Sequence, residues 1–211
     1  MISHALTIVA NELNRHLVDS YESTHPQVGL GNLAEGFAAS TGNGLSRNML
    51  YLSVVNVREE KTLKNLPNRM CNDSSLKIVY ENPPVFLNFL ILITATHPEY
   101  VNALSVLSRA IRFFQFRNVF TQDNVAPVSI TSSSVHIKPL DRLESFKLIF
   151  DLYSPTMEEV NHLWGTLGGK QYPFVLYMLR MLDLKFKAVL SEGEAVTQIV
   201  RNFHHKNSGA A

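Results

Sequence analysis

Two short motifs in the sequence have the spacing of known chemical sites. Glu159 and His162 are spaced as E-x-x-H, the pair with which the helices of di-iron bundles bind metal. That site needs four helices, whereas this sequence predicts three. Residues 29–34 read G-x-G-x-x-A, which binds dinucleotide phosphates when it joins a strand to a helix and an acidic residue follows about twenty positions later. No helical pattern follows here and no acidic residue lies near position 50, so we interpret both motifs as structural.

The single cysteine and a pair of histidines are the other candidates for chemistry. Cys71 lies in a polar stretch with no histidine nearby in the sequence to activate it as a nucleophile. His204 and His205 lie close to the C-terminus without an acidic partner. Serine nucleophile elbows, zinc-protease motifs, P-loops and EF-hand loops are absent from the sequence. We therefore expect no catalytic, cofactor-binding or metal-binding residues and no enzyme activity; an enzyme of unknown class that uses Cys71 or His162 is the alternative.

The charge balance argues against several classes of partner. The chain has 19 basic and 18 acidic residues, a net charge of +1, which disfavours binding to nucleic acid or to anionic lipid. The N-terminus lacks the pattern of a signal peptide, and the longest apolar stretch, residues 83–95, is too short to span a bilayer. We expect a protein that is made and assembled in the cytoplasm. Its low charged fraction, 18%, suits a subunit that buries much of its surface against neighbours, although a large core would give the same composition.

Three segments have the apolar spacing of amphipathic helices. The first covers residues 2–21. The second begins with a predicted capping box, T-H-P-E at residues 96–99, and runs to about Phe116. The third begins at Ser154 and is stopped by a Gly-Gly pair at residues 168–169. Trp164 lies on its apolar face, and we expect this side chain in the core rather than at an interface.

Strands are predicted where β-branched and aromatic residues are concentrated. Residues 85–94 are nearly all apolar and predict a central strand that is buried on both faces. Further strands are predicted at residues 28–34, 49–57, 119–122, 146–153 and 172–184, and polar loops at about 65–76 and 121–142. The expected fold class is α/β (α+β), a mixed sheet flanked by about three helices. We predict one domain over residues 1–188 and an extended C-terminal arm over residues 189–211.

Four segments, in order along the chain, resemble the signatures of one protein family. They are residues 52–65, with the run R-E-E-K-T-L-K-N; residues 82–92, beginning N-P-P; residues 110–122, with A-I-R-F-F-Q and V-F-T-Q; and residues 163–173, with L-W-G-T-L-G-G-K. The resemblance as a whole covers residues 1 to about 187. The family is that of the cap, or tube-terminator, proteins of extracellular contractile injection systems, which are phage-tail-like particles.

The resemblance implies both a fold and a role. The fold would be like that of phage tail terminators. The role would be a hexameric ring that ends the inner tube, away from the baseplate, and couples it to the last sheath layer. The implied partners are copies of the chain itself, the tube protein, the sheath protein and possibly a cap paralogue. The implied location is a particle that is either released from the cell or anchored to a membrane. We expect that the chain lacks the additional C-terminal domain of some family members. The alternative is another structural adaptor of the same particle, at the baseplate or at tube initiation.

The resemblance also suggests two groups of contact residues. The charged run that follows the second predicted strand is a candidate for contacts between subunits: Arg58, Glu59, Glu60, Lys61 and Asn65. A solvated turn whose ion pairs contribute little is an equally good interpretation of this run. The C-terminal arm is a candidate for pairing with the sheath or a neighbouring subunit, through Val196, Ile199, Val200 and Phe203.

Overall fold

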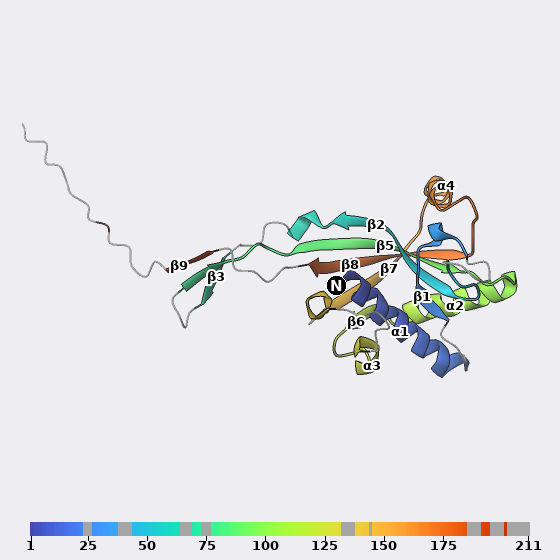
Figure 1. The fold of residues 1–211 in the computed structure, drawn as a ribbon, viewed down its shortest axis with the longest axis horizontal. Helices are drawn as coiled ribbons and strands as arrows, with labels where there is room; N and C mark the ends of the chain where they lie inside the picture. Colours follow the sequence, from blue (N-terminus) through green and yellow to red (C-terminus); the bar gives the residue numbers. More distant parts are fainter. Residues whose placement is uncertain are drawn as a thin grey trace, which may run out of the picture.

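A six-stranded mixed sheet forms the body of the protein in a computed structural model (Figure 1). The structure describes residues 1–22, 27–37, 44–63, 69–72, 77–131, 138–143, 145–184, 191–194 and 201. The strand order is β1-β2-β5-β8-β7-β6. β1 pairs with β2 in parallel, and every other pair in this sheet is antiparallel. The strands are β1 Val28–Leu30, β2 Leu50–Glu59, β5 Val85–Ala95, β6 Val119–Thr121, β7 Lys147–Tyr153 and β8 Phe174–Leu184. The predicted mixed sheet is confirmed.

Helices cover both faces of this sheet. α1 (Ile2–Tyr21) and α2 (Tyr100–Phe116) pack on one face, and α4 (Met157–Thr166) packs on the other. The short α3 (Pro127–Thr131) contacts α1. The three predicted helices are therefore present. α3 and a 3-10 turn at Pro139–Asp141 lie in the stretch 121–142, for which we predicted only a loop.

β5 is central and links the two layers of the core. Its side chains alternate, so that Ile91 and Ile93 face α1 and α2 while Leu92 faces α4, and all three are fully buried. The prediction of a strand buried on both faces is confirmed for this part of β5. The larger core cluster, on the α1 and α2 side, contains an aromatic group in which the rings of Phe114 and Tyr177 are 4.6 Å apart.

A buried carboxylate fastens α1 to the rest of the body. Glu12 is 1% exposed, and its oxygens accept hydrogen bonds from Arg117 at 2.7 Å and from the Ser129 hydroxyl at 2.6 Å. The backbone N–H of Ala126 also donates to it at 3.1 Å, and Arg15 pairs with it from the same helix. Because every one of these partners except Arg15 lies outside α1, this carboxylate connects the helix to the end of α2 and to α3.

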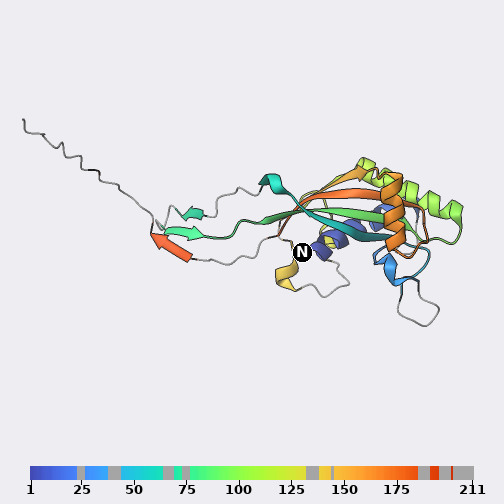
Figure 2. The same ribbon diagram turned by 90° about the horizontal axis from the view of Figure 1, so that it is seen from above.

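A second, three-stranded antiparallel sheet lies beyond the body. It consists of β3 (Arg69–Asn72), β4 (Lys77–Tyr80) and β9 (Ser191–Glu194), in the order β3-β4-β9. β3 follows β2 in the chain, β4 precedes β5, and β9 follows β8. The small sheet therefore repeats the neighbour order of the three central strands and continues them away from the body (Figures 1 and 2).

The small sheet corrects one prediction. Residues 65–76, including Cys71, were predicted to be a loop, but β3 lies within this stretch. Four residues flanked by polar ones carry too weak a local pattern, and the strand is defined by its pairing with β4. β9 lies inside the predicted arm and pairs with β4; the boundary at residue 188 remains a prediction.

The starts of two helices also differ from the prediction: α2 lacks the predicted capping box, and α4 begins at Met157 rather than at Ser154. No capping box forms at residues 96–99: α2 begins at Tyr100, its N-cap Glu99 makes no side-chain cap bond, and the Thr96 hydroxyl instead donates to the carbonyl oxygen of Met49 at 2.9 Å. A tertiary contact to the start of β2 thus replaces the local cap. α4 does have a capping box, formed by Thr156 and Glu159.

Candidate interaction surfaces

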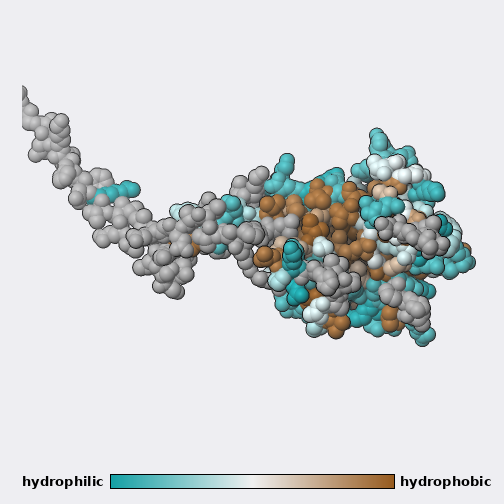
Figure 3. Space-filling model, in the orientation of Figure 1, coloured by the Kyte–Doolittle hydropathy of each residue, from teal (hydrophilic) through white to brown (hydrophobic). Residues whose placement is uncertain are grey.

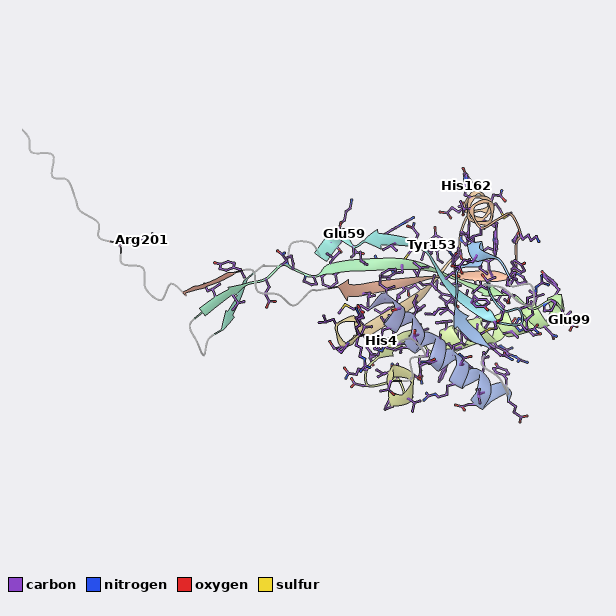
Figure 4. The ribbon with its side chains drawn as sticks, viewed as in Figure 1. His4, Glu59, Glu99, Tyr153, His162 and Arg201 are labelled. Carbon is purple, nitrogen blue, oxygen red and sulfur yellow. The ribbon has the colours of Figure 1, made fainter. Side chains whose placement is uncertain are left out.

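The charged run predicted to contact other subunits lies at the end of β2, where the strand leaves the body (Figure 4). Arg58, Glu59 and Lys61 are exposed. Glu60 instead fastens the turn internally: its carboxylate accepts hydrogen bonds from the Thr62 hydroxyl at 2.6 Å and from the Asn88 amide at 2.9 Å. The Thr62 hydroxyl, followed by Asn88, lowers the pKa of the Glu60 carboxyl below its usual value.

The remaining predicted contact residues are not described. Asn65 in the charged run and Val196, Ile199, Val200 and Phe203 in the arm all lie outside the described residues, as do His204 and His205. Arg201 is described and exposed.

The E-x-x-H motif serves the local structure of α4. The Glu159 carboxylate accepts hydrogen bonds from the backbone N–H of Thr156 and from the Tyr153 hydroxyl, each at 2.9 Å. These bonds, the backbone N–H of Thr156 first, lower the pKa of Glu159. His162 pairs with Glu158 at 3.7 Å, on the exposed side of the helix. Among the described residues, no group of three or more potential metal ligands is close enough to hold an ion.

The glycine motif has a packing role. β1 is followed by a 3-10 turn, Leu33–Glu35, and not by an α-helix. A Cβ atom on Gly31 would lie 2.6 Å from Leu45 and 2.7 Å from the Tyr51 ring, so a larger residue here would force these two side chains to shift. Trp164, by contrast, is 5% exposed and packs with Phe174 under α4, which confirms the prediction that it belongs to the core.

An apolar surface that sequence reasoning missed lies on β2 and β5. Val54, Val57 and Val85 are 40, 49 and 47% exposed. Val54 pairs with Ile91 and Val57 with Phe89, so these valines share the sheet face that α1 and α2 cover elsewhere. We call Val54, Val57 and Val85 the ribbon face. Figure 3 shows apolar side chains gathered on the part of the body next to the small sheet.

A second exposed apolar surface lies on α2. We predicted that its apolar face would include Tyr100, Val101, Leu104, Leu107, Ile111 and Phe114. Leu107 and Phe114 are buried, but Val101, Leu104 and Ile111 are 66, 42 and 37% exposed. We call Val101, Leu104 and Ile111 the helix face. Beside it, between the start of α2 and residues 171–174, lies an open groove of about 480 Å³ that Tyr100, Leu104 and Tyr172 line.

Comparisons with solved structures identify the fold. The chain is 13% identical to the PVC sheath/tube terminator of an extracellular contractile injection system in its extended state, with a TM-score of 0.56 over 95% of this chain and 64% of that one. It is 14% identical to the anti-feeding prophage cap, a tube terminating cap, with a TM-score of 0.54 over 92% of this chain and 60% of that one. The chain thus spans less than two thirds of the length of either structure.

No curated protein matches the chain. None of the helices in the described part of the chain is long and apolar enough to cross a membrane.

A family model covers almost the whole chain. The model of the Pvc16 N-terminal domain matches residues 4–198, which include all four segments that carry the resemblance. The match to this model and the shared fold with two terminators confirm the resemblance. The protein therefore belongs to the family of the Pvc16 N-terminal domain.

Proposed function

We propose that this protein is a structural cap that terminates the inner tube of a contractile, phage-tail-like injection particle and couples the tube to the last sheath layer. One observation carries the proposal. The family model covers residues 4–198, and a sheath/tube terminator and a tube terminating cap share the fold over more than nine tenths of the chain. A likeness that runs through the whole body, rather than through one motif, supports a shared architecture and role.

A structural role without catalysis is part of the proposal. The solved proteins with this fold are named for ending a tube. The two motifs with chemical spacing have local structural explanations in this chain, since Glu159 caps α4 and Gly31 packs beneath Tyr51.

The partners follow from the same role. A cap that closes a tube contacts the tube protein, the sheath protein and further copies of itself, and we propose a hexameric ring. A closed ring is built from head-to-tail contacts, which require two different surfaces on each subunit. The charged run at the end of β2, with Arg58, Glu59, Glu60, Lys61 and Asn65, is a candidate for contacts between subunits. The arm, with Val196, Ile199, Val200 and Phe203, is a candidate for sheath binding.

The location of the protein in the particle tests the proposal against a baseplate or tube-initiation adaptor. Purified particles would be labelled with gold-conjugated antibodies against this chain and viewed by electron microscopy. The proposal predicts label at one end, opposite the baseplate. Label at the baseplate end would favour the adaptor, and label along the tube would contradict both roles.

A further inference from the structure

The helical cover of the sheet ends partway along two neighbouring strands. On β2 the exposed fraction rises from 0% at Leu50 and 1% at Leu52 to 49% at Val57. On β5 it rises in the same direction, from 0% at Ile91 to 47% at Val85. All these side chains lie on one face of the sheet, so the core side of the sheet continues as an open apolar surface, the ribbon face.

The edge of the sheet is open at the same place. β1 pairs with β2 only at Leu50–Leu52, and no strand of the described residues pairs with β2 on that side beyond Leu52. An open edge beside an apolar face is a surface that proteins otherwise shield with charges, bulges or a covering element. Here the pairing of β2 with β5 shifts register between Val54 and Asn56, and the first charge on the strand is Arg58.

The helix face is on another side of the molecule. α2 packs over β5 and β8, the two middle strands of the sheet, whereas β2 and β1 lie toward one edge. Figure 2 shows α2 along one long side of the body and β2 toward the other. A single chain therefore presents two different apolar surfaces that it cannot bring together itself.

The charges beside Val57 and beside Ile111 are complementary. Glu59 pairs in register with Leu87 and lies on the same side of the sheet as Val57, while Arg58 lies on the opposite side. α2 has Arg109 and Arg112 and no acidic residue between Tyr100 and Phe116. Arg112 is exposed, next to Ile111 in the helix face. An acidic group beside one apolar surface and a basic group beside the other favour contact between unlike surfaces and disfavour contact between like ones.

We propose that the ribbon face of one copy binds the helix face of a second copy, head to tail. This inference rests on the proposed function, in which copies of the chain form a ring, and it assigns the two surfaces. Because each copy keeps one free surface of each kind, the contact repeats until a ring closes. The bound α2 then supplies the helical cover that the chain itself lacks over β2 and β5.

A mixing experiment tests the head-to-tail contact with the full chain. The ribbon variant carries Val54→Glu and Val57→Glu, and the helix variant carries Val101→Glu and Leu104→Glu. Both variants carry glutamates so that, in a mixture, the substituted ribbon face and the substituted helix face repel each other and cannot extend the mixed dimer. Native mass spectrometry, with one variant isotopically labelled, should detect loss of the wild-type oligomer for each variant alone. Mixing the two should give a species with one chain of each kind and nothing larger.

Controls make the result specific. Met157→Glu introduces the same charge on α4, at a side chain that is 76% exposed and outside both surfaces, and should assemble like the wild type. Circular dichroism melts confirm that each variant is folded, as expected for substitutions at exposed positions.

Three outcomes would overturn the inference: a wild-type chain that remains monomeric, a single variant that keeps the full oligomer, or a mixture that stays monomeric. In these cases the two surfaces bind something other than a second copy, such as the tube or sheath protein. None of these outcomes tests the cap role, which is decided separately by gold labelling and by tube length in particles.

Discussion

The two halves of β2 and β5 have similar residues and different surroundings. Leu52 and Val57 lie on the same side of the sheet, at opposite ends of β2, yet Leu52 is 1% exposed and Val57 is 49% exposed. Toward the body the strands are covered by α1 and α2. Away from the body the same strands continue, without that cover, into the small sheet (Figures 1 and 2). One end of each strand thus stabilises the fold, and the other is available for contacts.

Truncating this pair of residues should give the largest difference in stability. Leu52→Ala truncates a fully buried side chain at the body end of β2 and should lower the free energy of unfolding by about 2–5 kcal/mol. Val57→Ala, at an exposed position, should change it by about 0.5 kcal/mol or less. Urea denaturation of the isolated chain measures both. Equal losses would mean that the two ends of the strands are not different, and the comparison would fail.

Removing the buried carboxylate of Glu12 should have the next largest effect on stability. Glu12→Ala leaves Arg117, the Ser129 hydroxyl and the Ala126 N–H without their shared acceptor, and should cost about 3 kcal/mol of stability. Glu158→Ala, an exposed carboxylate on α4, is the matched control and should be nearly neutral. Thermal unfolding of the two variants gives the comparison. A loss below about 1 kcal/mol for Glu12→Ala would show that α1 is held by its apolar side alone.

The charged run should separate assembly from stability. Reversing both Glu59 and Glu60 to lysine should weaken ring assembly more than it lowers the melting temperature. The Glu60 carboxylate accepts hydrogen bonds from Thr62 and Asn88, so we expect a stability loss at Glu60; Glu59 lies beside Val57 of the ribbon face, so we expect the assembly loss there. Glu60→Lys alone should lower the melting temperature by a few degrees at most, and Glu59→Lys alone should reduce oligomer mass. An unchanged oligomer with Glu59→Lys would refute this division.

Deleting residues 189–211 should have the smallest effect on the body. The deletion removes β9, which pairs only with β4 among the described strands, and leaves the six-stranded sheet complete. The truncated chain should keep a cooperative unfolding transition. Particles that contain it should lose the connection between tube and sheath, as seen by electron microscopy. Normal particles would show that the arm does not make this connection.

Elements defined by local pattern could be predicted from the sequence. The apolar run at 85–94 predicted the central strand β5, and the apolar spacing of residues 2–21 predicted α1 with the observed bounds. β3 was missed because its four residues carry too little pattern without their partner β4. The capping box at Thr96 was wrong because the backbone of Met49, far away in the sequence, binds the same hydroxyl.

The contact surfaces were harder to predict for a related reason. Val54 and Val57 have the residue type of a buried strand, but they share one face only because the register shifts between Val54 and Asn56, and the missing helical cover makes them exposed. Composition signalled a surface low in charge without locating it. Likewise, the pattern of α2 did not distinguish Leu107, which packs on the sheet, from Leu104, which is exposed.

Tube length in particles tests the cap role most directly. Particles would be prepared from cells with and without this gene and their lengths measured by electron microscopy. The cap role predicts long tubes of variable length, ragged or without sheath, when the gene is absent. It further predicts uniform, fully sheathed particles when the gene is restored. Uniform, fully sheathed particles in the absence of the gene would contradict a role of this protein as the cap that ends the tube.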